Sequence, residues 1–262
     1  MAKFDGKFFK GMVGPVVYKQ YRGMQLVTAK STLTLASQTE NTKKAAAAFG
    51  LTSSLAADLR KNLCNIVTGF YDGTMVYRFK KLVQEAIYHS AGPEAGAYNF
   101  TANSFERLNG FEFNATSPVA SNFFIQPEQE LLGDNLMFKL PELRLSHDLK
   151  FPNNATSCLL HIAVGMYDLT YGHKTICPVQ SVEVLNEGSV IPAQSFEFTV
   201  VPGCLCITVL SFQYMQQTFS GQQIINSKAF NPVAVFSAVM ADGAVLPEQT
   251  SHWQPMRFKT IS

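Results

Sequence analysis

Charged residues are scarce in this sequence. Only 15% of its 262 residues are Asp, Glu, Lys or Arg, whereas 47% are hydrophobic; globular chains average about 25% charged residues. Because disorder accompanies high charge and few aromatic residues, a chain with 21 Phe is not intrinsically disordered. We expect a folded chain that buries a large core or covers apolar surface with partners.

Long apolar runs and paired cysteines are also missing. No stretch approaches the roughly 20 apolar residues of a membrane-spanning helix, so we expect no membrane span. The opening MAKFDGKFFKG is basic but lacks the apolar core of a signal peptide, so we expect synthesis in the cytosol and leave the final location open. The five cysteines show no paired spacing, and we expect them to be reduced and buried.

Motifs of common active sites are absent as well. The sequence contains neither GxxxxGK[ST] nor GxGxxG, and no Gly-x-Ser-x-Gly elbow. His161 lies in an apolar run, LLHIAV, where we expect a hydrogen-bonded wall residue rather than a base. His147-Asp148 and Asp168 with His173 come nearest to a metal site. We therefore predict no enzyme activity, no metal and no cofactor.

The few charges are unevenly distributed. Residues 1–92 hold 13 Lys and Arg against 5 Asp and Glu, a net charge of +8, whereas residues 93–262 hold 8 against 14, a net charge of −6. This asymmetry is compatible with a basic part that contacts nucleic acid, or with copies that dock basic end to acidic end. It is equally compatible with two halves that neutralise each other within one molecule.

The basic end opens with strand-forming residues. In GMVGPVVYKQYRGMQLV, residues 11–27, two apolar runs flank Arg22-Gly23, a pattern that favours a β-hairpin. A hairpin alone is marginally stable in water, so this one must join a sheet of its own chain or of a neighbour.

Two helices and a series of strands are predicted next. Residues 41–67 and 75–90 have helical spacing, with a capping-box pattern at Ser37-Gln-Thr-Glu40. The expected apolar stripe of the first helix is Ala45, Phe49, Thr52, Ala56, Leu59, Leu63 and Ile66, with Leu51 and Leu55 beside it. The stripe of the second is Val76, Phe79, Leu82, Val83 and Ile87.

Beyond residue 97, short apolar runs such as SFEFTVV alternate with turn residues, which is typical of antiparallel sheets. We therefore predict an α+β fold with an N-terminal β-hairpin, two α-helices and a C-terminal antiparallel β-sandwich, Ig-like or jelly-roll-like. Residues 1–96 would form a basic hairpin and two-helix region and residues 97–262 the sandwich, unless both form one continuous domain.

The order of several short motifs resembles a family of uncharacterised Bacteroidota proteins. The motifs are GxVGPVVYxxYRGxQLV, then SQTENTKKAAAAFG leading into a helix, then Phe111-Glu112-Phe113-Asn114. Members of that family are similar in size and share the opening turn, tyrosine strand and hairpin. The resemblance covers roughly the first 115 residues. It implies no catalytic residue, because no activity is attached to the family.

From these observations we predict a non-enzymatic, self-assembling structural protein, a subunit of a shell, tube, filament or scaffold. Its N-terminal hairpin would pair with a strand of another copy. The residues expected at that interface are Val16, Val17, Tyr18, Tyr21 and Arg22.

Two alternatives remain open. The chain could associate with nucleic acid through basic residues that neutralise phosphates, and these would be Lys7, Lys10, Lys19, Arg22, Lys43 and Lys44. It could instead be a small globular ligand-binding module with a site on its sheet loops. The single Trp253 fits a tail anchor better than an aromatic platform.

Overall fold

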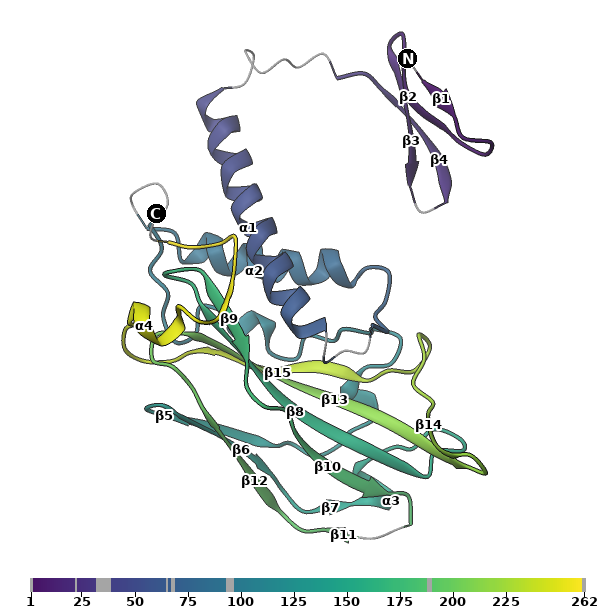
Figure 1. Ribbon diagram of the computed structural model, residues 1–262, viewed down its shortest axis with the longest axis vertical. Helices are drawn as coiled ribbons and strands as arrows, with labels where there is room; N and C mark the ends of the chain where they lie inside the picture. The colour runs from purple at the N-terminus through teal and green to yellow at the C-terminus, as the bar shows by residue number, and fades with distance from the viewer. Residues whose placement is uncertain are drawn as a thin grey trace. The chain divides into compact units, whose positions relative to one another are not determined.

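A computed structural model of the chain shows a mixed fold of helices and antiparallel strands (Figure 1). The structure describes residues 2–21, 23–31, 39–64, 66, 69–92, 97–187 and 190–260, apart from the side chains of residues 44 and 146. The chain divides into two compact units, Met1–Ala48 (unit 1) and Phe49–Ser262 (unit 2), and each is described by itself.

Unit 1 is a four-stranded antiparallel sheet in sequence order. Its strands are β1 (Lys3–Phe4), β2 (Phe9–Val13), β3 (Val16–Tyr21) and β4 (Met24–Ala29). The predicted hairpin is confirmed, because Val16 to Tyr21 pair with Ala29 to Met24. Gly23 turns the chain with a φ of +78°, a value that glycine adopts without strain. Arg22 lies outside the described residues.

The first helix, α1 (Glu40–Cys64), begins in unit 1. Thr39 caps it, because its hydroxyl accepts a hydrogen bond from the Thr42 N–H at 3.2 Å. Ser37, the capping residue expected from the sequence, lies outside the described residues. None of the helices in the described part of the chain is both long and apolar enough to cross a membrane.

Unit 2 is built around a seven-stranded antiparallel sheet (Figure 1). Its long central strands are β8 (Ser157–Asp168) and β13 (Leu205–Thr218). The others are β9 (His173–Ile176), β10 (Gln180–Leu185), β14 (Gly221–Ile224), β15 (Val233–Met240) and β16 (Gln254–Pro255).

The helices cover one face of this sheet and a smaller sheet covers the other (Figure 1). On one side lie α1 and α2 (Met75–His89). On the other lies the three-stranded sheet of β5 (Glu128–Leu132), β6 (Asn135–Leu140) and β12 (Gln194–Thr199). Short elements complete the unit: β7 (Leu143–Arg144), β11 (Val190–Ile191), α3 (Leu145–Asp148), α4 (Pro247–Thr250) and the turns η2 (Glu106–Leu108) and η3 (Val119–Ser121).

The central strands are buried on both faces. Ala163, Tyr167 and Ile207 join the hydrophobic cluster under the helices. Ile162 and Leu210 join the cluster toward the smaller sheet. Two-sided burial explains why these strands read as nearly continuous apolar runs in the sequence, since side chains on both faces must be apolar.

Helix α2 and the part of α1 from Phe49 onward belong to the same unit as the seven-stranded and three-stranded sheets. Leu55, Leu59 and Phe79 are fully buried in one cluster with Ile207 of the central sheet. The two compact units separate between Ala48 and Phe49, whereas the sequence suggested either a boundary between residues 96 and 97 or one continuous domain. A helical stripe shows that a face is apolar but does not identify the surface that it contacts.

Five free cysteines lie in unit 2, as expected from their unpaired spacing. Cys158, Cys177, Cys204 and Cys206 are buried, and Cys64 at the end of α1 is half-buried. Burial raises the pKa of the Cys177 thiol to about 11 and that of Cys206 to about 12. The buried thiols therefore carry little thiolate at neutral pH.

Candidate functional site

The pairing register assigns each side chain of the unit 1 sheet to one of two faces, since cross-strand partners share a face and neighbours alternate. Gly11 pairs with Tyr18, Tyr18 with Val27, and Phe4 with Phe9. The ring of Phe9 lies 4.8 Å from that of Phe4 and 5.7 Å from that of Tyr18, which places all three on one side. This uncharged face consists of Phe4, Phe9, Gly11, Val13, Val16, Tyr18, Gln20, Gln25, Val27 and Ala29.

The opposite side, here called the lysine face, consists of Lys3, Lys10, Met12, Val17, Lys19, Tyr21, Met24, Leu26 and Thr28. Lys3 lies directly opposite Lys10, an arrangement of like charges that destabilises a sheet by itself. Asp5 relieves part of this repulsion through an ion pair with Lys10 at 2.6 Å. The hydrogen bond from Lys10, together with that from the Phe8 N–H, lowers the pKa of Asp5 to about 2.

Neither face is covered within unit 1. None of its described side chains is buried, and Phe4, Met24 and Val27 expose 59%, 62% and 53% of their surface. A small sheet normally needs a buried hydrophobic face to be stable in water. Unit 1 by itself lacks one.

The strand pairing also locates the two edges of this sheet, the outer sides of β1 and β4. β3 is paired on one side by β2 and on the other by β4. Its backbone therefore cannot accept a strand from another copy, so pairing by the predicted hairpin would have to use its other strand, β4. Within the described chain, the outer edge of β4 carries no partner strand.

The side chains predicted at the interface divide between the two faces. Val16 and Tyr18 lie on the uncharged face, and Val17 and Tyr21 on the lysine face. Arg22 lies outside the described residues. The residues of β3 can therefore contribute side-chain contacts, but not backbone pairing.

The basic residues predicted to contact nucleic acid do not form one cluster. Lys10 and Lys19 share the lysine face with Lys3. Lys7 lies 5.5 Å from the ring of Phe8. Lys43, on α1, forms an ion pair with Glu40 at 2.8 Å. Arg22 and the side chain of Lys44 lie outside the described part of the structure.

In unit 2, the histidine that we expected in a wall position has both ring nitrogens bonded. His161 Nδ1 lies 2.7 Å from Ser181 Oγ, and its Nε2 lies 3.0 Å from Gln213 Oε1. The three residues stand on the adjacent strands β10, β8 and β13. This is the arrangement of a hydrogen-bonded wall residue.

Asp168 and His173 belong to a turn that is closed by hydrogen bonds. Asp168 Oδ1 accepts the N–H groups of Thr170 and Tyr171, each at 2.9 Å, and Oδ2 accepts the Thr250 hydroxyl at 2.6 Å. His173 Nδ1 lies 3.6 Å from Asp168 Oδ2. These contacts join α4 to the β8–β9 turn. Among the residues that the structure describes, no three His, Cys, Asp or Glu side chains converge as metal ligands would.

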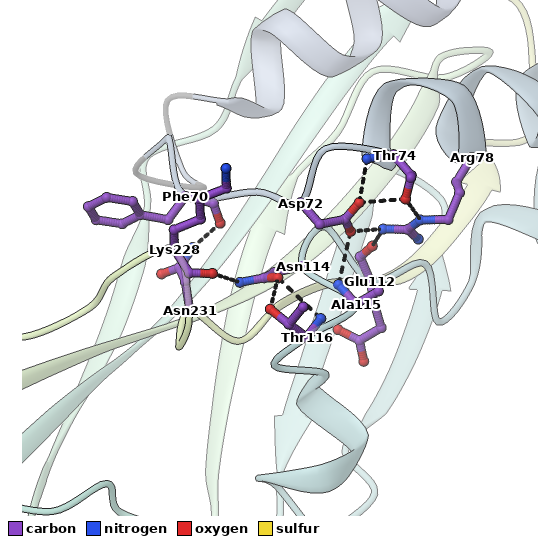
Figure 2. Close-up of polar contacts among 10 residues, drawn as sticks. All are labelled: Phe70, Asp72, Thr74, Arg78, Glu112, Asn114, Ala115, Thr116, Lys228 and Asn231. Carbon is purple, nitrogen blue, oxygen red and sulfur yellow. Dashed lines mark hydrogen bonds and ion pairs between the residues drawn. The ribbon is translucent and has the colours of Figure 1, made fainter. Parts of the chain in front are cut away.

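A polar cluster that the sequence did not indicate links the residues before α2 to those after Phe111 (Figure 2). Asp72 accepts hydrogen bonds from the Thr74 N–H at 2.7 Å, the Thr74 hydroxyl at 2.6 Å and the Ala115 N–H at 3.0 Å, and it also pairs with Arg78. Burial alone would raise the pKa of Asp72, but these bonds hold it well below its usual value. Arg78 also donates to the Glu112 carbonyl at 2.9 Å.

The Glu112 side chain points away from this cluster (Figure 2). Its Oε1 accepts a hydrogen bond from the Ala120 N–H at 3.3 Å. Its Oε2 is buried and has no hydrogen-bond partner among the described residues. Burial raises the pKa of Glu112 to about 7, against the opposing effects of backbone hydrogen bonds and Arg78. A buried carboxylate oxygen without a hydrogen-bond partner lowers the stability of the folded chain. Because carboxyl groups with strongly raised pKa values are frequent at functional sites, Glu112 is a candidate functional residue.

Comparison with protein-family models, with curated proteins and with solved structures finds no match for this chain. Two features of the structure bear on the function: the uncovered sheet of unit 1, and the Glu112 carboxyl of unit 2, whose Oε2 has no hydrogen-bond partner among the described residues.

Proposed function

We propose that this chain is a structural subunit that assembles with copies of itself through the unit 1 sheet. One observation carries the proposal: no described side chain of that sheet is buried, while many large apolar ones are exposed. The exposed ones are Phe4, Phe9, Met12, Val13, Tyr21, Met24, Leu26 and Val27. Burying one such side chain fully contributes about 1.5–3 kcal/mol, so a partner surface would stabilise the sheet strongly.

The distribution of charge favours contact through the uncharged face. Two copies that meet there bury Phe4, Phe9 and Val27 against the same residues of the other copy and leave the lysines in water. Contact through the lysine face would instead bring Lys3, Lys10 and Lys19 of one copy toward those of the other, which is unfavourable at low dielectric. A symmetric contact of one patch with itself is the common solution for two identical chains.

The free edge of β4 offers a second contact of the same kind. An unpaired strand edge presents a row of N–H and C=O groups that another strand can pair with. Pairing β4 with β4 of a neighbour extends the sheet, and together with the face contact it can propagate an assembly. In this proposal β4 is the strand of the predicted hairpin that pairs with the neighbour.

Two finer expectations belong to the same proposal. The first is that the sheets of unit 2 form a β-sandwich, Ig-like or jelly-roll-like. It is supported by the cluster that Phe138 and Phe198 of the smaller sheet share with Ile162 and Phe212 of the larger one. The second is membership of the Bacteroidota family, supported by the motif order in residues 1–115.

Placing a charge on the uncharged face should prevent assembly. We expect Val27→Glu to convert an oligomeric wild type into a 28.9 kDa monomer, because a buried, unpaired carboxylate opposes the contact. Light scattering coupled to size-exclusion chromatography measures the mass.

Leu26→Glu is the matched control. Leu26 precedes Val27 on β4 and is comparably exposed, but it lies on the lysine face opposite Lys19. This variant should keep the wild-type mass. A wild type that is monomeric at all concentrations, or two variants with the same mass, would contradict the proposal.

The lysine face supports a second candidate function, binding of nucleic acid. Lys3, Lys10 and Lys19 present three positive charges on one side of a small sheet. If all three neutralise phosphates of a single strand, the logarithm of the association constant should fall with the logarithm of salt concentration with a slope of about −2. Fluorescence anisotropy with a labelled oligonucleotide measures this slope, and Lys19→Glu should reduce it. Absence of binding at low salt would exclude this candidate.

A further inference from the structure

Unit 2 contains an apolar groove of about 640 Å³ beside Glu112. One wall comes from the segment that runs from η3 to β5 and includes Val119, Phe123 and Phe124. The other wall is β15, with Phe236, and Leu210 of β13 contributes as well. Among the described residues that line the groove, Glu112 is the single ionisable one.

A β-bulge shapes the wall formed by β15. Thr208 pairs with Ser237 whereas Val209 pairs with Val235, so Phe236 is an extra residue on β15. Bulges re-aim side chains and are frequent next to functional sites. The ring of Phe236 lines the groove and packs edge-on against Phe138 of the smaller sheet, with ring centroids 5.2 Å apart.

Alternation along the chain directs Glu112 toward the groove. Phe111 and Phe113 are buried in the cluster under the helices, so the residue between them faces the opposite side. The backbone of Glu112 forms an isolated antiparallel β-bridge with that of Ala234, a residue of the hydrophobic cluster toward the smaller sheet. A carboxyl group thus occupies a position where the surrounding pattern would place an apolar side chain.

The backbone around Glu112 is held firmly. The Gly110 N–H donates to the Val235 carbonyl at 2.8 Å, the Val235 N–H to the Phe111 carbonyl at 2.9 Å, and the Phe113 N–H to the Val233 carbonyl at 2.9 Å. The backbone that carries the Glu112 side chain is therefore fixed before any ligand arrives, which reduces the entropic cost of binding.

We propose that this groove binds an apolar compound bearing one primary amine, with the ammonium group at the Glu112 carboxyl and the apolar part along Val119, Phe123 and Phe236. The ammonium group brings a positive charge and N–H donors to a carboxyl whose Oε2 has no hydrogen-bond partner among the described residues. An apolar groove with a single acidic group favours a single cation and disfavours an anion. This inference does not depend on assembly through unit 1.

Nearby charges leave the Glu112 carboxyl available for this role. Arg78 on α2 and Arg107 on η2 border the neighbouring cavity that Glu112 also lines. Arg78 is paired with Asp72, and Arg107 with Glu85 at 3.4 Å. The described groove residues on β13, β15 and the segment before β5 are uncharged.

The affinity of the groove for the amine should depend on pH. Because an ammonium ion binds the ionised carboxylate, this affinity should rise as the pH increases from 6 to 8 through the Glu112 pKa of about 7.

Calorimetric titration of the full chain at pH 8 with n-octylamine, octan-1-ol and octanoate tests the proposal. These three probes share the alkyl chain and differ in the head group. We expect octylamine to bind at least about tenfold more tightly than octanol, and octanoate to bind least. Glu112→Gln should lower the octylamine affinity by about tenfold and leave that of octanol unchanged. Glu128→Gln, at an exposed carboxyl on β5, is the matched control and should bind as the wild type does.

Phe124→Ala provides a second variant that does not disturb the core, because the Phe124 side chain is 56% exposed. This variant should lower the affinity for octylamine and for octanol by similar factors, because it removes an apolar side chain that lines the groove and leaves the Glu112 carboxyl unchanged. Three results would overturn the proposal: no binding of octylamine, equal binding of octylamine and octanol, or unchanged octylamine affinity in Glu112→Gln.

Discussion

Replacing Asp72 by Asn should lower the free energy of unfolding of unit 2 by about 2–4 kcal/mol at pH 7. Only 12% of the Asp72 side chain is exposed, and it accepts bonds from Thr74, Ala115 and Arg78. The side-chain NH₂ group of Asn would point at the N–H and O–H groups of Thr74, Ala115 or Arg78, which are themselves hydrogen-bond donors, so at least one of these bonds would be lost. It would also leave the Arg78 guanidinium without its counter-charge in a half-buried site.

The loss should depend on pH in a defined direction. The pKa of Asp72 is depressed below its usual 3.8 in the folded chain. Its stabilising effect is therefore complete above that value and is lost as the pH falls through and below it. The difference between wild type and Asp72→Asn should consequently shrink in acid.

Urea unfolding at pH 7 and pH 3, followed by fluorescence, measures both effects. The single Trp253 packs against the cluster between the two sheets and reports on unit 2 alone. Asp134→Asn, at an exposed carboxyl between β5 and β6, is the control and should change little. Equal stability of wild type and Asp72→Asn at pH 7 would mean that the cluster in Figure 2 contributes nothing to folding.

Glu112→Gln should have the opposite effect. The folded chain raises the pKa of Glu112 from 4.5 to about 7, so it favours the protonated form. The wild type should lose stability as the pH rises between these two values, by about 3 kcal/mol at most, and stay level above them. The neutral amide of the variant removes this slope.

At pH 8 we expect Glu112→Gln to be more stable than the wild type by about 1–2 kcal/mol, because the gain is partly offset by a buried amide without a partner. Denaturation curves at several pH values between 4.5 and 8, again followed by Trp253, measure the slope. A wild type with a flat profile across that range would show that the carboxyl is well solvated. Glu112→Gln is also the variant used in the octylamine titration. It therefore tests both the destabilisation caused by the Glu112 carboxylate and the contribution of that carboxylate to amine binding.

Local patterns in the sequence were enough to predict the hairpin of β3 and β4 and the two long helices, but not β1 and β2, which complete the four-stranded sheet. The hairpin around Gly23 follows from two apolar runs and a turn residue, and the pairing of Tyr21 with Met24 confirms it. The helical spacing correctly identifies Leu59 and Phe79 as core residues. It fails at Phe49, which is 54% exposed, because the spacing continues beyond the part of α1 that meets a sheet, and at Val76, which is 40% exposed while Met75 beside it is buried.

The candidate sites could not be predicted in the same way. Asp72 and Glu112 are 40 positions apart in the sequence and meet through Arg78, a contact that no local pattern encodes. The motif Phe-Glu-Phe-Asn did contain a usable signal, since a charge between two core phenylalanines is unusual for a strand buried on both faces. Similarly, the apolar and basic residues of β3 and β4 indicated contact with a partner, but only the register separates them into two faces.

The uneven burial of the thiols has a practical consequence. Cys158, Cys177, Cys204 and Cys206 are shielded by the sheets, whereas Cys64 is partly accessible at the end of α1. A maleimide dye or spin label would therefore attach at Cys64 without any engineered mutation. Energy transfer or dipolar spectroscopy between labelled chains would then give the spacing of α1 from one subunit to the next.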